Sequence, residues 1–308
     1  MNFKDCINSH PFVLMEGALG ERLKREFNLD ISGTVAMADL VYKEEGRAAL
    51  EQLWKEYMDI ARRYRLPFLA TTPTRRANKE RVFMAGYDES IMADNVAFLR
   101  KMKEAAKIDM YIGGLMGCKG DAYTGEGALD LEEATDFHSW QANLFKSAKV
   151  DFLYAVIMPV LTEAAGMAVA MSATDIPYII SFTIQRDGRL IDGHTIDEAI
   201  RYVDNHVSNK PVCYMTNCVH PDIVYEALSH KFNQTQAVQT RFMGIQANTS
   251  SLSYHKLDGA KDLHTSSPHD LGKAILKLKF DYHFKIFGGC CGTDSRHLEE
   301  IAKTAGEL

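Results

Sequence analysis

The chain has 308 residues, of which 46% are hydrophobic and 25% charged, and its formal net charge is −6. These values are typical of a globular protein with a sizeable core, and the acidic balance without a basic tail argues against nucleic acid as a partner. No run of about 18 apolar residues is present, and the first residues lack the apolar core of a signal peptide. We therefore expect no membrane span and a cytoplasmic location.

Short apolar runs alternate with longer helical stretches along the chain. The apolar runs predict strands at residues 12–15, 67–71, 109–113, 151–156, 177–182, 211–216, 242–247 and 284–288. Helices are predicted near residues 18–28, 44–65, 89–107, 131–148, 161–171, 195–208, 221–231, 268–281 and 294–305. Nearly continuous apolar strands suit a parallel sheet that is buried on both faces. The pattern favours an α/β fold of one domain, residues 1–308, built as a (β/α)8 TIM barrel, with a doubly wound sheet as the alternative.

Helix starts and loops add detail to this pattern. Thr195 and Asp294 are predicted N-caps, and Pro221 and Pro268 suit the first turn of a helix. Two stretches without a clear period predict long loops, one Gly-rich at residues 114–127 after the third strand and one at residues 249–267 after the seventh. Loops of such length are often functional.

Three of the six cysteines stand at predicted strand ends. Cys218 closes the sixth strand, and Cys290 and Cys291 follow the eighth strand within a run of three glycines. Because the carboxyl ends of all strands meet at one rim of a barrel, we expect these three thiols to lie together there. Of the others, Cys213 is interpreted as a core residue, and Cys6 and Cys118 have no partner at metal-ligand spacing.

Three thiolates predict a zinc site, since soft sulfur ligands select zinc and similar metals. With three protein ligands, one coordination position stays open, and a substrate thiol bound there would ionise at neutral pH. The natural reaction is attack of that sulfur on a methyl group carried by a positively charged donor. Two alternatives stay open: His220 completes a closed structural site, or the thiols are free and no metal binds.

The run Gly288-Gly289-Cys290-Cys291-Gly292-Thr293, with Asn217-Cys218 upstream, resembles the signature of the homocysteine S-methyltransferase family. Weaker similarities are the segments 15–20, 69–74 and 192–195. The resemblance implies a (β/α)8 barrel whose Zn²⁺ is held by Cys218, Cys290 and Cys291. It also implies methyl transfer to homocysteine to give methionine, in methionine biosynthesis. The partners would be a small-molecule thiol and a methyl donor, and a homo-oligomer is left open.

The chain also departs from the family pattern. The family's fourth strand ends in Glu-Thr-x-Pro, whose glutamate helps to bind the amino group of homocysteine, whereas this chain has Val156 followed by Ile157, Met158 and Pro159. Glu16 replaces an aspartate, Ala18 a glycine and Pro73 an asparagine. Two further interpretations therefore stay open: a divergent member that uses another small thiol or methyl donor, and a non-catalytic zinc-binding protein on the same barrel.

The resemblance and the strand ends together indicate candidate substrate-binding residues, and no catalytic residue is predicted beyond the metal ligands. The candidates are Glu16, Gly17, Thr71, Thr72 and Asn248. Each has a structural alternative, such as a surface acid for Glu16 and strand-end hydrogen bonding for the threonines. Arg75 and Arg76 would either bind an acidic group of the substrate or begin a solvated helix. Glu163 matches a family Glu-Ala pair and is expected to be structural or to support residues that contact the substrate.

Overall fold

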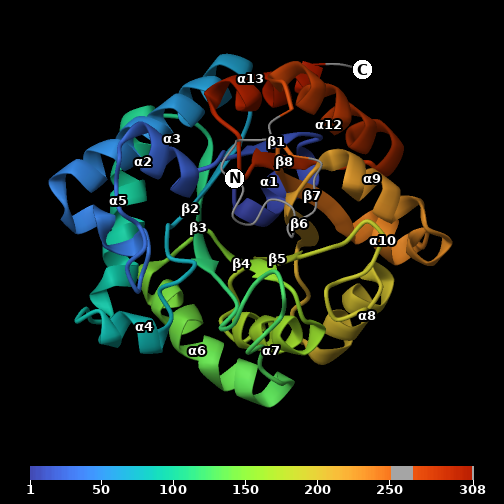
Figure 1. The fold of residues 1–308 in the computed structure, drawn as a ribbon, viewed down its shortest axis with the longest axis horizontal. Coiled ribbons are helices and arrows are strands. Elements are labelled where there is room, and N and C mark those ends of the chain that lie inside the picture. The colour runs from blue at the N-terminus through green and yellow to red at the C-terminus, as the bar shows by residue number, and fades with distance from the viewer. Residues whose placement is uncertain (251–265, 307–308) are drawn as a thin grey trace.

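A computed structural model describes residues 1–250 and 266–306. Eight parallel strands pair in sequence order, and β8 closes on β1 (Figure 1). The strands are β1 Val13–Met15, β2 Phe68–Thr71, β3 Met110–Met116, β4 Phe152–Met158, β5 Tyr178–Phe182, β6 Cys213–Val219, β7 Phe242–Ala247 and β8 Ile286–Gly289. The predicted (β/α)8 barrel is confirmed, and the doubly wound sheet is excluded because the sheet has no open edge.

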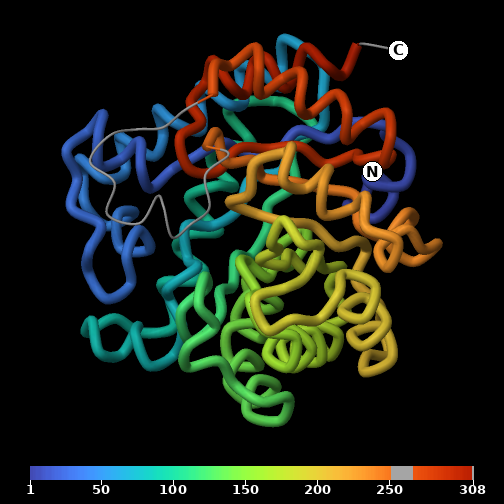
Figure 2. The backbone as a smooth tube through the Cα atoms, turned by 45° about the vertical axis from the view of Figure 1, so that its right-hand side comes forward, coloured from blue at the N-terminus to red at the C-terminus, as the bar shows by residue number. Residues whose placement is uncertain are grey.

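Helices surround the barrel, except for α1, which lies at one of its ends (Figures 1 and 2). They are α1 Phe3–Ser9, α2 Gly20–Glu26, α3 Glu44–Tyr64, α4 Lys79–Met84, α5 Ser90–Ala106, α6 Leu131–Ala148, α7 Leu161–Ser172, α8 Ile196–His206, α9 Pro221–Ser229, α10 Gln236–Arg241, α12 Pro268–Tyr282 and α13 Ser295–Lys303. Short 3-10 turns lie at Ala38–Tyr42, Lys231–Asn233 and Thr304–Gly306. The predicted N-caps Thr195 and Asp294 both accept hydrogen bonds from the first turn of their helices, and Pro221 and Pro268 occupy first turns.

Two apolar cores follow from the barrel geometry. The larger core lies between the strands and the surrounding helices. The smaller one fills the barrel itself with inward side chains such as Met15, Tyr154 and Met215. Helix α1 belongs to this inner core, because Phe3 stacks on Phe152 at 4.3 Å between ring centroids. Since Phe152 is the first residue of β4, α1 covers the amino-terminal end of the barrel and leaves the opposite rim for a site.

Several elements differ from the sequence-based expectation. Helices α1, α4 and α10 were not predicted, because each has only six or seven residues and therefore too few turns for a helical period. The predicted loop at residues 114–127 is wrong at its start, because β3 continues to Met116. A Cβ atom at Gly113 would come within 2.5 Å of the Phe152 ring, and one at Gly114 within 2.6 Å of the Phe145 ring. These glycines make room for aromatic packing and do not end the strand.

The second predicted loop, residues 249–267, falls for the most part on residues 251–265, which lie outside the described residues. Its described ends approach each other, since the Ser266 amide donates to the Thr249 carbonyl at 2.8 Å. Among the residues that the structure describes, no helix has the length and apolar character needed to cross a membrane.

Candidate metal centre

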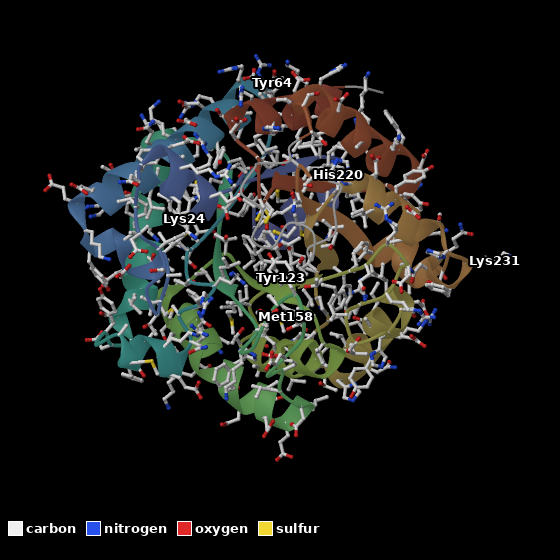
Figure 3. The ribbon with its side chains drawn as sticks, viewed as in Figure 1. Lys24, Tyr64, Tyr123, Met158, His220 and Lys231 are labelled. Atoms are coloured by element: carbon white, nitrogen blue, oxygen red, sulfur yellow. The ribbon has the colours of Figure 1, made fainter. Side chains whose placement is uncertain are left out.

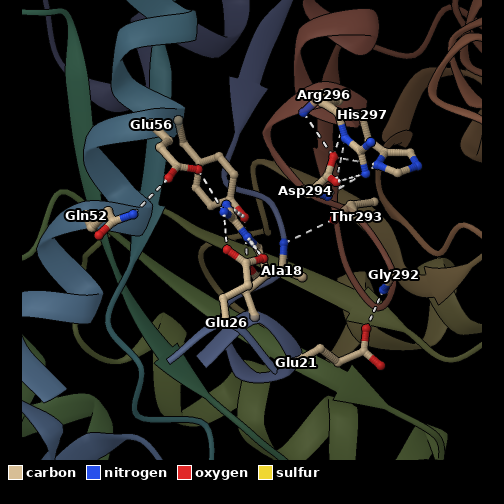
Figure 4. Close-up of polar contacts among 12 residues, drawn as sticks. Ala18, Glu21, Glu26, Gln52, Glu56, Gly292, Thr293, Asp294, Arg296 and His297 are labelled. Atoms are coloured by element: carbon tan, nitrogen blue, oxygen red, sulfur yellow. Dashed lines mark hydrogen bonds and ion pairs between the residues drawn. The ribbon is translucent and has the colours of Figure 1, made fainter. Parts of the chain in front are cut away.

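The turn after β8 is tied to the start of the chain. Thr293 accepts a hydrogen bond from the Ala18 amide at 3.1 Å, and the Gly292 amide donates to Glu21 (Figure 4). The Thr293 hydroxyl also donates to the Cys290 carbonyl at 2.7 Å. A Cβ atom at residue 289 would lie 2.2 Å from the Thr293 hydroxyl oxygen, so only glycine fits there. The cysteine pair therefore sits on a turn whose backbone is held on several sides.

Cys218 reaches the same place through an irregular strand. Its φ is +57°, in the left-handed region that L-residues seldom adopt, and the pairing of β6 with β7 shifts register between Asn217 and Val219. In a regular strand, successive side chains point to opposite faces, so with Asn217 directed into the barrel Cys218 would face the outer helices. The irregularity instead aims the Cys218 side chain at the rim, as bulges beside functional sites commonly do.

The three predicted thiols lie together at the carboxyl ends of the strands. The sulfur atoms of Cys218, Cys290 and Cys291 are all within 4.8 Å of one another, and the Cys218–Cys291 distance is 3.3 Å. Hydrogen bonds from the other two thiols lower the pKa of Cys218 well below its usual value, and the same pairing raises the pKa of Cys290 and of Cys291. The cluster therefore holds one thiolate readily, and its donor set and spacing fit a metal ion that would ionise the other two.

Tyr123 also contacts the cluster, and sequence reasoning missed it. It comes from the loop between β3 and α6, and in Figure 3 it lies close to the centre of the circle that the surrounding helices form. The negative charge of Cys218, burial of the ring and a hydrogen bond to Cys218 raise the pKa of Tyr123 well above its usual value, which keeps the phenol protonated. Nothing in the local sequence Asp-Ala-Tyr-Thr-Gly indicates this contact, because the loop folds back across the mouth of the barrel.

A buried polar network lies beneath the cluster, inside the barrel. The Tyr154 hydroxyl donates to the Asn217 side-chain oxygen at 2.7 Å and also contacts Gln246 at 3.2 Å. Ser181 donates to the same oxygen, and the Asn217 amide donates to Gln246. These contacts join β4, β5, β6 and β7 directly below Cys218. Because buried polar groups without partners are costly, the network favours a single arrangement of the strand that carries Cys218.

Glu16, the charged candidate for substrate binding, is buried within the protein. Its carboxylate accepts hydrogen bonds from the Trp54 indole at 2.8 Å, from the Thr71 amide at 2.9 Å and from the Thr71 hydroxyl. Only 3% of its surface is exposed, and burial raises its pKa to about 7. Glu16 thus links β1, β2 and α3 under the rim.

The uncharged candidates for substrate binding are also buried, on two sides of the rim. A Cβ atom at Gly17 would come within 2.8 Å of the Tyr57 ring. The Thr72 hydroxyl contacts that of Thr74 at 2.7 Å and accepts from the Leu115 amide at 3.1 Å, on the side of β2 and β3. Asn248 lies beside the cysteine pair, because the neighbouring Ala247 carbonyl accepts from the Cys290 amide at 2.7 Å.

His220 and the remaining cysteines do not join the cluster. The His220 ring caps α9, accepting from the Asp222 amide at 3.2 Å, and its other nitrogen contacts the Ser266 hydroxyl at 3.2 Å. Cys213 and Cys6 are fully buried in the inner core. Among residues 1–250 and 266–306, the one cluster whose ligand atoms are spaced to hold a metal ion is that of Cys218, Cys290 and Cys291.

Comparison with known proteins decides the family. The family model described as homocysteine S-methyltransferase matches residues 13–305. The chain belongs to the homocysteine S-methyltransferase family. The match spans all eight strands and both segments that supply the clustered cysteines, so the barrel and the cysteine cluster of this family member lie inside the matched region.

Solved structures agree on the fold. The oxidized form of the homocysteine methyltransferase MmuM from Escherichia coli superposes with a TM-score of 0.76 at 18% identity, covering 96% of this chain and 97% of that one. Its metallated form gives a TM-score of 0.75 at 17% identity, with the same coverage. Its apo form gives a TM-score of 0.68 at 17% identity, covering 97% of each chain. At such identities the likeness shows the barrel alone. No curated protein sequence matches the chain.

Proposed function

We propose that this protein is a zinc-dependent thiol S-methyltransferase, with homocysteine as the leading acceptor and methionine as the product. The observation that carries the proposal is the grouping of three thiols within 4.8 Å of one another at the mouth of a barrel that belongs to this family. The metallated form of the related MmuM structure supports a metal at this fold.

The donor set fits zinc in particular. Sulfur ligands favour zinc over magnesium or calcium, and catalytic zinc sites commonly have three protein ligands. Cys218, Cys290 and Cys291 would hold the ion. When bound, it would keep an acceptor thiol ionised at neutral pH, where a free thiol with a pKa of about 8.5 is mostly protonated.

The remaining chemistry concerns the acceptor, the donor and the residues around them. The acceptor sulfur would attack the methyl carbon of a positively charged donor, the bond from that carbon to the donor would break, and the thiol proton would pass to solvent. Tyr123 holds the Cys218 side of the cluster by its hydrogen bond, and the network of Asn217, Tyr154 and Gln246 holds it from below. These residues position the sulfur ligands before a substrate arrives, which lowers the cost of reaching the reactive geometry.

One observation favours a second candidate, a different small thiol as acceptor. The position at which the family has a glutamate for the amino group of homocysteine is Val156, which is 6% exposed and belongs to the inner apolar core. Burying an ammonium group without a carboxylate partner is unfavourable. An acceptor without an amino group at that position would suit Val156 better.

Metal content tests the site. Protein purified without added metal should contain about one equivalent of zinc, as expected for a single site of three thiolates and one open position. Cys290→Ala should lose most of it. Cys213→Ala is the matched control, because Cys213 is a buried cysteine on the same strand as Cys218, outside the cluster, and this variant should keep its zinc. Zinc far below one equivalent in the wild type would contradict the metal site.

Methyl transfer tests the reaction. The zinc-loaded protein should methylate homocysteine, or another small thiol in a panel, from a sulfonium or quaternary ammonium donor, and a chelator should abolish the turnover. A protein that binds zinc tightly but methylates no thiol with any donor would favour a non-catalytic zinc-binding role.

A further inference from the structure

A cavity opens at the rim that carries the cysteine cluster, between the loops that follow β2 and β3. Its volume is about 210 Å³. This is below the range of about 300–1,000 Å³ that is typical of sites enclosing a whole ligand, so it suits one end of a small molecule. It is lined by Arg75, Arg76, Arg81, Cys118, Lys119, Gly120, Asp121, Ala122 and Tyr123.

The charged side chains that line this cavity are mostly positive. Arg75, Arg76, Arg81 and Lys119 contribute positive charge, and Asp121 is the one carboxylate among the described residues of the lining. The Asp121 carboxylate is engaged by its own loop, since it accepts from the amides of Tyr123 and Thr124, each at 2.8 Å. These hydrogen bonds, with a smaller contribution from the charge of Arg75, lower the pKa of Asp121. Within the lining, this one ionised carboxylate stands against four positive charges.

The two arginines in the loop after β2 have no side-chain partner among the described residues. Lys119 pairs with Glu80 at 3.4 Å, and Arg81 donates to the Thr34 carbonyl at 3.4 Å. By contrast, the side chains of Arg75 and Arg76 make neither an ion pair nor a hydrogen bond within the described part of the chain. Guanidinium groups carry five donors suited to carboxylates and phosphates, and here two such groups face a cavity with those donors unused.

The backbone that carries Arg75 is rigidly placed. The Thr74 hydroxyl donates to the Leu115 carbonyl at 2.8 Å, and Gln141 donates to the Thr74 carbonyl at 3.2 Å. The next loop packs directly on Arg75, because a Cβ atom at Gly117 would lie 2.5 Å from the Arg75 carbonyl oxygen and 2.7 Å from its Cγ atom. The position of Arg75 is therefore set before any ligand binds.

Tyr123 connects this cavity to the cysteine cluster, because it lines the cavity and its hydroxyl hydrogen-bonds Cys218. We propose that the cavity beside Arg75 and Arg76 binds the carboxylate of the thiol acceptor, whose sulfur then lies at the cysteine cluster beyond Tyr123. The assignment to the acceptor follows from charge, since a cluster of arginines attracts a carboxylate and repels a positively charged methyl donor. That the bound molecule is the thiol acceptor rests on the proposed function. That it carries a negative charge is inferred from the cavity alone.

Binding of two methyl thioethers to the metal-free full-length protein tests this cavity. The probes are 3-(methylthio)propionate and 2-(methylthio)ethanol, which share the methylthioethyl group and end in a carboxylate and a neutral hydroxyl, respectively. Their binding is measured by calorimetry or ligand-observed NMR. The wild type should bind the acid about tenfold more tightly than the alcohol, the effect of one charge-assisted contact. The double variant Arg75→Gln/Arg76→Gln should reduce this preference to about twofold or less.

Arg47→Gln is the matched control, since Arg47 is an exposed arginine on α3, outside the cavity, and this variant should keep the wild-type preference. Thermal unfolding of all variants checks that they fold. Equal affinity for the two probes, no binding of the acid, or a preference that persists in the double variant would each overturn the proposal. Neither probe has a free thiol and no metal is present, so the result does not depend on whether the protein binds zinc or transfers methyl groups.

Discussion

At the scale of single residues, Glu16 makes the stability of the protein depend on pH. Its pKa is raised from 4.5 to about 7 by burial. Between these values the folded protein holds a proton that the unfolded chain releases, so the free energy of unfolding falls as pH rises through this window. Glu16→Gln removes the effect. Its free energy of unfolding, relative to wild type, should increase by about 2 to 3 kcal/mol between about pH 5 and about pH 8.

Urea unfolding of both proteins at the two pH values measures this change. Loss of the carboxylate contacts to Trp54 and Thr71 adds a constant offset that cancels in the comparison. Glu44→Gln, at an exposed position at the start of α3, should follow the wild-type profile. If the free energies of unfolding of Glu16→Gln and wild type differ by the same amount at both pH values, the role of burial is refuted.

At the scale of elements, Glu163 holds the loop between β3 and α6 in place. Its fully buried carboxylate accepts from the Lys119 amide at 2.7 Å and the Leu129 amide at 3.4 Å, near the two ends of the loop, and contacts the His138 ring at 3.1 Å. This agrees with the expected structural role of Glu163. The loop carries Tyr123, so one buried side chain of α7 fixes a segment that reaches the cysteine cluster.

Glu163→Gln should cost about 1–3 kcal/mol of stability, because one carboxylate oxygen becomes an amide group that cannot accept the existing hydrogen bonds. Hydrogen exchange of the Lys119 and Leu129 amides should accelerate more than that of amides in the strands. Glu132→Gln, on the exposed face of α6, should change neither quantity. Unchanged exchange at both amides would show that the loop is held by other contacts.

At the scale of the whole molecule, α1 packs against the end of the barrel opposite to the cysteine cluster. Phe3 of α1 is 2% exposed and packs on Phe152 and Tyr111 at the amino-terminal end. Phe3→Ala should lower the free energy of unfolding by about 3–5 kcal/mol. Zinc content and probe binding at the other rim should stay as in the wild type.

Chemical denaturation followed by circular dichroism measures the loss, with Phe83→Ala as the control. Phe83 is 50% exposed, so the same truncation there removes less buried surface and should cost less than about 1 kcal/mol. A loss of zinc in folded Phe3→Ala protein would show that the two ends of the barrel are coupled.

Much of the architecture can be predicted from the local pattern of residues in the sequence. The eight apolar runs predict the strands because a parallel barrel buries every strand on both faces, which leaves a nearly continuous apolar signal. Helix starts such as Thr195 follow from side chains that cap the nearest amides. Glycines are harder to read, as at Gly113, where the reason for the glycine is the Phe152 ring on the next strand. That contact joins distant residues and leaves no trace in the local sequence.

The site, too, has features that the sequence predicts and features that it does not. The positions of Cys218, Cys290 and Cys291 at predicted strand ends were enough to predict that the three thiols meet, since any parallel barrel brings these ends to one rim. How the three thiols meet depends on the folded chain. The left-handed backbone of Cys218 turns its thiol to the rim, the loop after β3 brings Tyr123 to the cluster, and the cavity beside Arg75 forms from two separate loops. These features depend on contacts between segments far apart in the chain, which a local pattern of residues does not encode.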